Sequence, residues 1–317
     1  MRDSRSAVPV AVTSRSFSKN PVLREELLAR YSNVTFNDAG ASLSGAGLLQ
    51  FLEGHEKAIV ALERIDADLV ARLPALQVIS KYGVGLDNID VSALGRHGKR
   101  LGWRGGVNRR SVSELALGFM ISLLHLVPQA GAEIRGGTWR QIQGRQLTGK
   151  TVGILGCGHV GKDLIRLLQP FGCRILVHDI VADPVFFAEF GVELLPLDLV
   201  LSQSDVVTVH LPFDASTANL LSAERIARMK PCSVLVNTAR GGIVDEAALK
   251  SALTGGHLSG AALDVFAIEP PSDNKLLGLP NFLVTPHIGG SAAEAVLAMG
   301  RSAIQGLDEN SVPPAQV

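Results

Sequence analysis

Cysteine is scarce in this sequence, and its spacing fits neither a disulfide framework nor a metal site. Cys157, Cys173 and Cys232 are the only cysteines in 317 residues, and they lack both paired spacing and the C-x-x-C pattern of zinc ligands. An odd, sparse set is typical of reduced thiols in a cytoplasm. We therefore predict a cytoplasmic protein with no metal site, whose cysteines serve as small buried apolar residues.

The sequence also has no excess of either positive or negative charge. Thirty basic residues balance thirty acidic ones, whereas a non-specific nucleic-acid binder normally carries an excess of lysine and arginine. No apolar run reaches the roughly 18 residues that span a bilayer, and no apolar signal core follows the polar start Met1–Ser6. The sequence therefore predicts neither a nucleic-acid partner nor a membrane partner.

What the sequence does contain is a regular alternation of short β-branched runs and amphipathic stretches. Such alternation indicates βαβ units and parallel sheets, and 317 residues are more than one domain of roughly 100–200 residues usually holds. In the first third we predict strands at Val8–Thr13, Val34–Phe36, Ala58–Ala61 and Val78–Tyr82, and helices at Val22–Tyr31, Leu69–Leu73 and Val91–Arg96.

A glycine-rich break at Gly102–Gly106 precedes a long predicted helix. Ser111 and Glu114 have the spacing of a capping box, and the apolar stretch Leu115–Val127 stops before Pro128. A helix that is apolar on most of its surface must be buried. Burial between domains and burial against a second subunit both explain this pattern, and a homodimer built on Leu115–Val127 is our hypothesis.

A second series of strands and helices opens with a dinucleotide-binding fingerprint. The segment Gly156–Gly161 reads G-x-G-x-x-G between a short apolar strand and an amphipathic helix, where its glycines permit a tight turn, close approach of a pyrophosphate and helix–sheet packing. The predicted strands of this series are Thr151–Leu155, Cys173–Asp179, Asp205–His210, Ser233–Asn237, Gly260–Val265 and Phe282–Thr285, and the helices are Lys162–Phe171 and Ala292–Leu307.

The acid that ends the second strand of this series points to NAD. Asp179 lies 18 residues after Gly161, close to the roughly 20 expected for an acid that accepts hydrogen bonds from the ribose. A 2′-phosphate would be repelled there, and no arginine follows to receive one. We therefore predict NAD as the cofactor, with its first contacts at Gly156, Gly158, His159, Val160, Gly161 and Asp179.

Four further segments give the sequence a family resemblance. Residues 81–90 read KYGVGLDNID, residues 237–246 read NTARGGIVDE, residues 262–266 read ALDVF and lead to Glu269-Pro270, and residues 285–290 read TPHIGG. With the glycine fingerprint, and in this order, they resemble the signatures of the D-isomer specific 2-hydroxyacid dehydrogenases, the group that includes phosphoglycerate dehydrogenase.

The resemblance implies a catalytic triad of Arg240, Glu269 and His287, and each role has a physical reason. The guanidinium of Arg240 can bind a substrate carboxylate and polarise a 2-oxo group. Histidine can exchange a proton in both directions of a hydride transfer near neutral pH, as expected of His287. A carboxylate at Glu269 would orient that ring and favour its protonated form.

The resemblance also implies further contacts. Substrate contacts are expected at Val84, Gly85, Asn108, Arg240 and His287, and additional cofactor contacts at His210, Leu211, Pro212, Thr238, Ala239, Arg240, Asp264, His287 and Gly289.

Two departures from the family pattern concern the substrate. The turn Ala61–Arg64 carries only Arg64 where phosphoglycerate dehydrogenases have several cations, and Arg104-Gly105 replaces the common Thr-Pro. A phosphoglycerate dehydrogenase-like activity and a hydroxypyruvate or glyoxylate reductase-like activity both stay open.

These observations predict an α/β fold of two Rossmann-like or flavodoxin-like domains with parallel sheets. The NAD-binding domain, residues 104–289, is inserted in a substrate domain made of residues 1–103 plus 290–317. The expected function is NAD-dependent hydride transfer between nicotinamide and a small D-2-hydroxy or 2-oxo acid. The alternatives are a non-catalytic NAD-sensing protein of the corepressor type and a dehydrogenase of an unusual donor. A formate dehydrogenase-like reaction ranks lower, because those enzymes have glutamine where Glu269 stands.

Overall fold

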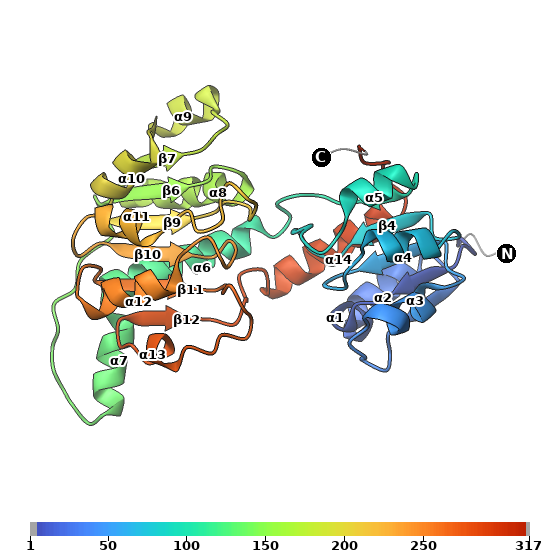
Figure 1. The fold of residues 1–317 in the computed structure, drawn as a ribbon, viewed down its shortest axis with the longest axis horizontal. Coiled ribbons are helices and arrows are strands. Elements are labelled where there is room, and N and C mark those ends of the chain that lie inside the picture. The colour runs from blue at the N-terminus through green and yellow to red at the C-terminus, as the bar shows by residue number, and fades with distance from the viewer. Residues whose placement is uncertain (1–4, 315–317) are drawn as a thin grey trace. The chain divides into compact units, whose positions relative to one another are not determined.

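The protein, described here by a computed structural model over residues 5–314, forms two compact units around separate sheets (Figure 1). The first unit contains the chain up to Asn108 and again from Ala293 onward, and the second contains Arg109–Ala292. The boundaries expected from the sequence stand a few residues earlier, at 103–104 and 289–290. Both sheets are parallel throughout, which confirms the predicted α/β fold with two parallel-sheet domains.

The first unit is a five-stranded sheet with helices packed on it. The strand order is β2-β1-β3-β4-β5, with buried β1, β3 and β4 in the middle. The strands are β1 (Val10–Val12), β2 (Val34–Phe36), β3 (Lys57–Val60), β4 (Val78–Lys81) and β5 (Arg100–Gly102), and the helices are α1 (Arg15–Lys19), α2 (Pro21–Leu28), α3 (Gly45–Leu52), α4 (Ala67–Arg72), α5 (Val91–Arg96) and α14 (Ala293–Gly306).

Glycines let α14 pack very close to this sheet and to α2. A Cβ atom on Gly300 would lie 2.3 Å from Leu23 Cδ1, and one on Gly102 would lie 2.1 Å from the carbonyl oxygen of Gly306. The hydroxyl of Ser80 donates to the carbonyl of Ala303 at 2.6 Å. Residues from the C-terminal end of the chain therefore complete the core that the N-terminal strands begin.

The second unit is a seven-stranded sheet of order β12-β11-β10-β9-β6-β7-β8. Its strands are β6 (Thr151–Leu155), β7 (Arg174–His178), β8 (Val192–Leu194), β9 (Val206–Val209), β10 (Val234–Asn237), β11 (Gly260–Leu263) and β12 (Phe282–Val284). Its helices are α6 (Arg109–Leu124), α7 (Val127–Arg135), α8 (His159–Leu168), α9 (Pro184–Phe190), α10 (Leu197–Gln203), α11 (Ala223–Arg228), α12 (Glu246–Thr254) and α13 (Asn274–Leu277), with a 3₁₀ turn at Gln169–Phe171.

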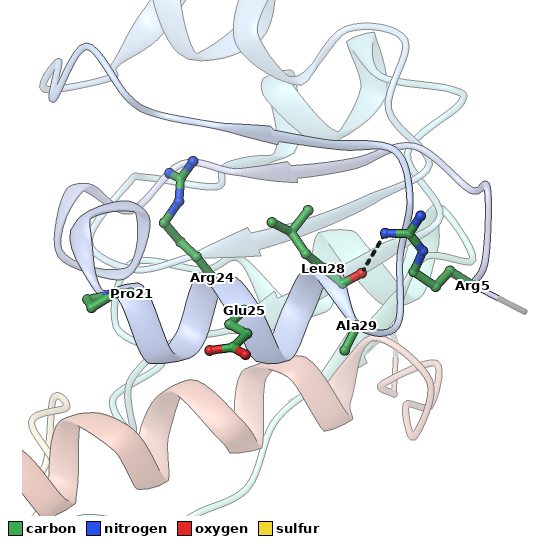
Figure 2. Close-up of a pocket in the computed structure, with 6 residues that line it drawn as sticks. All are labelled: Arg5, Pro21, Arg24, Glu25, Leu28 and Ala29. Atoms are coloured by element: carbon green, nitrogen blue, oxygen red, sulfur yellow. Dashed lines mark hydrogen bonds between the residues drawn. The ribbon is translucent and has the colours of Figure 1, made fainter. Parts of the chain in front are cut away.

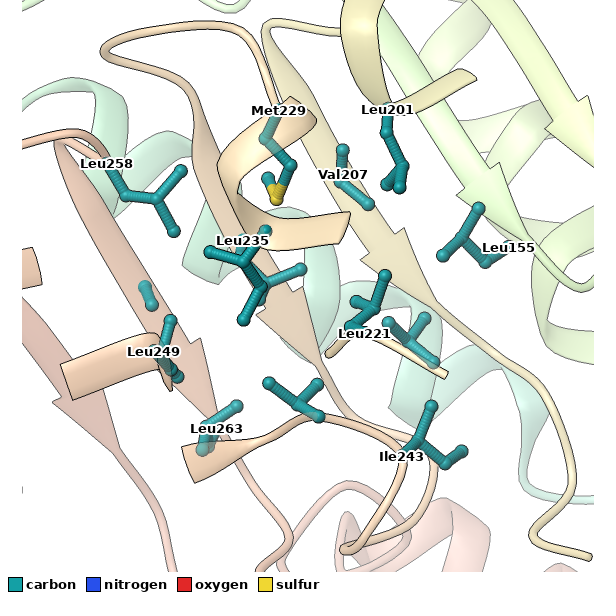
Figure 3. Close-up of a cluster of buried hydrophobic side chains, with 14 of the residues drawn as sticks. Leu155, Leu201, Val207, Leu221, Met229, Leu235, Ile243, Leu249, Leu258 and Leu263 are labelled. Carbon is teal, nitrogen blue, oxygen red and sulfur yellow. The ribbon is translucent and has the colours of Figure 1, made fainter. Parts of the chain in front are cut away.

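Apolar side chains alternate across this sheet and so bind a helical layer to each face. On β10, Leu235 packs with residues of α10, α11 and α12, as Figure 3 shows. Its neighbours Val234 and Val236 point to the opposite face, where they join the apolar residues of α6 and α8. The central strands are consequently buried on both faces, so only their ends are accessible.

The start of α6 differs from the prediction. The helix begins at Arg109, so Ser111 lies inside it and is not an N-cap, and the capping box with Glu114 does not form. The Ser111 hydroxyl donates to the carbonyl of Gly289 at 2.5 Å. Ser111 thus bonds to a residue 178 positions away in the chain, and not to the nearby amide that the capping-box spacing predicted.

The apolar stretch Leu115–Val127 was expected to form one helix and instead breaks. Leu126 adopts a left-handed conformation with φ 56°, α6 ends at Leu124, and α7 leaves at an angle of 63° with Pro128 in its first turn. Proline is well tolerated there because the first amides of a helix have no intrahelical acceptor.

No single helix among residues 5–314 is long and apolar enough to cross a membrane; the bent pair α6 and α7 meets only the length and composition criteria.

Several short elements were not predicted, among them β5, β8 and the helices α9–α13. The helix after the fingerprint also starts earlier than expected, at His159 and not at Lys162, with Gly158 as its N-cap. This shift places His159, Val160 and Gly161 in the first turn of α8.

Candidate active site

The candidate site lies at one edge of the seven-stranded sheet. In a parallel sheet all carboxyl ends meet at the same edge, and ligands bind there in open α/β folds, where the strand order reverses. Here the order reverses at β6, which stands between β7 and β9. The predicted site residues of this unit all follow the ends of β6, β7, β9, β10, β11 and β12.

The glycine-rich turn after β6 contains three glycines, and each position favours glycine for a different physical reason. Gly156 has φ 95°, and a Cβ atom there would lie 2.8 Å from the backbone of His210. A Cβ atom on Gly161 would lie 2.3 Å from the carbonyl oxygen of Gly156, so this glycine lets α8 pack on the turn. Gly158 is exposed and has nothing within 4 Å of its Cβ position. Space is therefore open at the N-terminus of α8, where free amides and the helix dipole favour a phosphate.

Asp179, which follows β7, ties this turn to the next strand. One carboxylate oxygen accepts from the amide of Cys157 at 2.6 Å and the other from the amide of Val181 at 2.8 Å. The side chain is half-buried. A carboxylate oxygen has more than one acceptor position, so these bonds orient Asp179 and leave it able to accept from a ribose hydroxyl.

Glu269 and His287 meet after β11 and β12. Nδ1 of His287 lies 2.9 Å from Oε2 of Glu269, while Oε1 of the same carboxylate accepts from the amide of Phe266 at 3.1 Å. The His287 side chain is 52% exposed and that of Glu269 40%. Because the carboxylate fixes Nδ1, the Nε2 atom of the exposed ring is left as the nitrogen that can exchange a proton with a ligand.

A buried aspartate holds the loop that carries His287. Asp264 is 1% exposed, and its carboxylate accepts from the Thr285 hydroxyl at 2.5 Å and from the amides of Ile288 and Gly289 at 2.7 and 2.8 Å. His287 itself has φ 55°, a conformation that is uncommon for residues other than glycine. The three hydrogen bonds to Asp264 stabilise this unusual backbone. Asp264 therefore positions the loop that carries His287. The predicted contact of Asp264 with the cofactor would be a second role of this residue.

The turn that carries Arg240 packs against the loop of Glu269. A Cβ atom on Gly241 would lie 1.9 Å from the carbonyl oxygen of Phe266, so only glycine allows the two backbones to approach this closely. The side-chain amide of Asn237 donates to the carbonyl of Arg240 at 2.8 Å, and its oxygen accepts from the amide of Ala239 at 3.0 Å. Arg240 is half-buried. It follows β10, and Glu269 follows the neighbouring strand β11.

Two buried polar atoms at this edge have no hydrogen-bond partner among residues 5–314. They are Nδ1 of His210 and Oγ1 of Thr238, at the ends of neighbouring strands β9 and β10. Burial lowers the pKa of His210 to about 3, so the ring is neutral and its Nε2 faces the Thr208 hydroxyl at 2.9 Å. Unsatisfied buried polar atoms are rare and point to a missing partner. With the open glycine turn they fit a dinucleotide that crosses this edge. Leu211 and Pro212 follow His210 directly.

The other predicted substrate contacts lie in the first unit. Val84 and Gly85 follow β4, and Asn108 ends the first segment of that unit. No amide hydrogen bond from Val84 or Gly85 to another group is present within the described chain. The indole of Trp103, which was not predicted as a site residue, donates to the carbonyl of Val84 at 2.9 Å.

Residues 5–314 contain no cluster of three or more metal-ligand side chains. A shallow depression of about 550 Å³ lies on α2, lined by Arg5, Pro21, Arg24, Glu25, Leu28 and Ala29 (Figure 2). None of the predicted site residues lines it.

A parallel sheet of this order, with a glycine-rich turn at the reversal point and an acid after the next strand, defines a Rossmann-type dinucleotide-binding protein. Comparison with known proteins narrows the class. The profile of the D-isomer specific 2-hydroxyacid dehydrogenase NAD binding domain matches residues 117–289. This chain belongs to the D-isomer specific 2-hydroxyacid dehydrogenase family, and its second unit contains the NAD binding domain of that family.

Individual relatives are consistent with this assignment. The chain is 41% identical over 233 residues to D-3-phosphoglycerate dehydrogenase of Mycobacterium bovis, which covers 73% of this chain and 44% of the relative. It is 37% identical over 242 residues to hydroxypyruvate reductase of Thermotoga maritima, covering 75% and 78%. A crystal structure described as a D-isomer specific 2-hydroxyacid dehydrogenase from a Polaromonas species superposes with a TM-score of 0.86 at 29% identity, covering 95% and 96%. The chain thus spans less than half the length of the mycobacterial relative.

Proposed function

We propose that this protein is an NAD-dependent oxidoreductase that transfers a hydride between nicotinamide and C2 of a small D-2-hydroxy or 2-oxo acid. The observation that carries the proposal is the Glu269–His287 pair, with its Nδ1–Oε2 distance of 2.9 Å, at the same sheet edge as the glycine-rich turn. Relatives named D-3-phosphoglycerate dehydrogenase and hydroxypyruvate reductase support it. The D stereochemistry rests on family membership.

The second unit supplies the groups that would hold the cofactor. The amides at the start of α8 suit the pyrophosphate, and Asp179 suits ribose hydroxyls and disfavours a 2′-phosphate. We assign the unpartnered atoms of His210 and Thr238 to the nicotinamide half. When bound, the reduced cofactor supplies the hydride that the reaction needs.

His287 is the proposed proton donor and acceptor. Reduction of a 2-oxo acid adds one hydride to C2 and one proton to the carbonyl oxygen, and Nε2 of a protonated His287 would give that proton. In the reverse direction the same nitrogen would take the proton from the hydroxyl group. Glu269 holds Nδ1–H and stabilises the charged ring, so its role is to position His287 and to support its charge.

Arg240 is the proposed anchor of the substrate carboxylate and polariser of the carbonyl group. Its guanidinium offers two parallel N–H groups to a carboxylate. In the first unit, the amides of Val84 and Gly85, which have no acceptor within the described chain, are proposed to donate to a substrate carboxylate, and Asn108 is proposed as a further substrate contact.

A panel of 2-oxo acids tested with NADH would examine the proposal directly. The panel contains glyoxylate, hydroxypyruvate, pyruvate and 3-phosphohydroxypyruvate, and the measurement is the loss of NADH absorbance. We expect turnover of at least one acid and its loss in His287→Asn. Tight NADH binding without turnover of any acid would instead favour the non-catalytic NAD sensor.

We also propose that the chain forms a homodimer. The predicted interface on the whole stretch Leu115–Val127 is wrong for its first part, because the α6 residues Leu115–Leu124 pack within their own unit against α8, β10 and β11, so the proposal concerns α7. Helix α7 buries none of its side chains, and Val127 and Ile134 are 54% and 57% exposed. Figure 1 shows α7 projecting from the body of its unit. An apolar helix surface left uncovered favours a protein partner, here a second copy of the chain. Light scattering at micromolar concentration should give twice the monomer mass, and Ile134→Asp should lower it; a monomeric parent protein would overturn this proposal.

A cytoplasmic location is proposed from the state of the thiols. Cys157, Cys173 and Cys232 are all unpaired, as expected in a reducing compartment. The prediction that the cysteines are buried is wrong for Cys232, which is exposed, while Cys157 is buried and Cys173 half-buried.

A further inference from the structure

Two exposed apolar side chains flank the loop Gly83–Gly85. The strands β3, β4 and β5 are neighbours in that order, so the segments that follow them meet at one edge of the five-stranded sheet. Leu62 follows β3 and is 88% exposed, and Trp103 follows β5 and is 44% exposed. The loop with the two amides that have no acceptor within residues 5–314 follows β4, between them.

Trp103 is fixed in place beside this loop. Its only polar atom, Nε1, donates to the carbonyl of Val84 at 2.9 Å. Tryptophan has a single donor and no acceptor, so the exposed remainder of the indole is an apolar plane. The hydrogen bond holds that plane next to the predicted position of the substrate carboxylate.

Leu62 is fixed by the backbone on either side of it. The side-chain amide of Asn88 donates to the carbonyls of Ala61 and Glu63 at 3.0 and 2.6 Å. The buried ammonium of Lys81 donates to the carbonyl of Ala61 and, at 2.6 Å, to Oδ1 of Asn88. Three hydrogen bonds therefore tie this turn to the segment that carries the loop and hold Leu62 in its exposed position.

The charges in these segments disfavour a phosphorylated substrate. Glu63 lies in the same turn as Leu62 and accepts from the amide of Ala61 at 2.7 Å. Arg64 is paired with Asp66 at 3.5 Å, and the buried Lys81 is bonded to backbone and amide oxygens. Arg104, next to Trp103, is an exposed cation. A dianionic phosphate needs several cations, and the carboxylate of Glu63 would repel it.

We propose that Leu62 and Trp103 form the apolar walls of the substrate side-chain subsite, and that the preferred substrate is a 2-oxo or 2-hydroxy acid with an aliphatic or aromatic side chain. This inference rests on the proposed function, because it places the substrate carboxylate at Val84 and Gly85.

The test measures kcat/KM with NADH for glyoxylate, 4-methyl-2-oxopentanoate, phenylpyruvate and 3-phosphohydroxypyruvate. Glyoxylate has no side chain and so reports on the proposed reaction alone. We expect the two apolar acids to exceed 3-phosphohydroxypyruvate by at least about 10-fold, since one methylene in an apolar pocket changes discrimination by roughly 10-fold or more. A preference for the phosphorylated acid would overturn the subsite and leave the reaction class intact.

Variants separate the walls from the loop. Trp103→Ala and Leu62→Asp should each lower the ratio of kcat/KM for phenylpyruvate to kcat/KM for glyoxylate by about 10-fold or more. Trp103→Phe keeps an aromatic wall without the bond to Val84, so it should retain most of the preference. Leu199→Ala, at an exposed leucine of α10, is the matched control. Equal losses on glyoxylate and phenylpyruvate would mean a role for Trp103 in the loop alone and would overturn the subsite.

Fluorescence gives a readout that does not depend on turnover. With NAD⁺ present, phenylpyruvate should quench the emission of the parent protein and not that of Trp103→Phe. Quenching that depends on Trp103, without turnover of any acid, would support the subsite and overturn the reaction. Quenching that is equal in both proteins, or absent from both, would overturn the subsite.

Discussion

Nδ1 of His287 lies 2.9 Å from Oε2 of Glu269, although the two residues stand on loops that follow different strands. The strands β11 and β12 are neighbours, and the backbone at Phe266 holds the second oxygen of the same carboxylate at 3.1 Å. Glu269 is therefore held by the backbone on one side and holds the imidazole on the other, which fixes the direction in which Nε2 points.

This relationship predicts unequal effects at the two positions. His287→Asn should lower kcat by about 10²–10⁴-fold, because it removes the proton donor, and should leave the dissociation constant of NADH within about 3-fold. Glu269→Gln keeps a hydrogen bond to Nδ1 and removes the charge, so its loss of kcat should be smaller. Steady-state kinetics and NADH titration measure both effects. His125→Asn and Glu189→Gln, at exposed positions, are the matched controls. Near-parental kcat in His287→Asn would assign the proton to another group.

Asp179 allows a test of cofactor choice that separates charge from structure. Asp179→Asn keeps an acceptor for the amide of Cys157 and removes the repulsion of a 2′-phosphate. It should therefore raise the affinity for NADPH relative to NADH by about 10-fold or more, since like charges placed together cost several kcal/mol. Asp179→Ala also loses the bonds to Cys157 and Val181 and should weaken the binding of both cofactors. Fluorescence titration with each cofactor measures the ratio, and an unchanged ratio in both variants would remove Asp179 from this role.

Asp264 should contribute to the stability of the folded protein as well as to its activity. Asp264→Asn turns an amide group toward at least one donor of the Thr285–Gly289 loop, which leaves buried N–H groups without an acceptor. We expect the free energy of unfolding to fall by about 2–3 kcal/mol, in the range for a lost hydrogen bond to a charged group. Thr285→Val removes one of the three bonds and should cost about 1 kcal/mol. Urea denaturation measures both, with Asp68→Asn on the exposed surface of α4 as control; equal stability of Asp264→Asn and the control would contradict this role.

His210 predicts how stability depends on pH. Burial lowers its pKa from the ordinary value of 6.5 to about 3, so below about pH 6.5 the unfolded chain binds a proton that the folded chain does not. His210 makes its full contribution to the free energy of unfolding above the pKa that it has in the unfolded chain. As the pH falls below that value, the contribution decreases by about 1.4 kcal/mol per pH unit. His210→Gln should reduce the slope of unfolding free energy between about pH 6 and pH 4 by that amount. His125→Gln should not change the slope, and a loss of slope in that control would show that another process is being measured.

The parts of the site that the sequence predicts well are those with local causes. The turn Gly156–Gly161 follows an apolar strand and opens an amphipathic helix. Gly161 lies against the backbone of Gly156, and Gly156 lies against the backbone at the end of the neighbouring strand β9. The parallel character of the sheets likewise follows from short hydrophobic runs that are buried on both faces and alternate with helices.

What the sequence misses depends on partners far away in the chain. Ser111 has the spacing of a capping residue, yet its hydroxyl donates to Gly289. Short strands such as β8 pair at a sheet edge and carry little pattern of their own. Trp103 sits in a glycine-rich segment that resembles a linker, and only its bond to Val84 relates it to the site. A tryptophan within the glycine-rich segment Gly102–Gly106 was the available signal.

The first unit uses both ends of the chain, and this has a consequence for how the protein is made. Helix α14 packs on α2 where Gly300 meets Leu23, and on β4 and β5 where Ala303 meets Ser80 and Gly306 meets Gly102. During synthesis the N-terminal strands leave the ribosome long before α14 is translated, with the whole second unit in between. The sheet of the first unit must therefore wait with an apolar face uncovered while the second unit can already fold, and this interval is when a chaperone would be needed most.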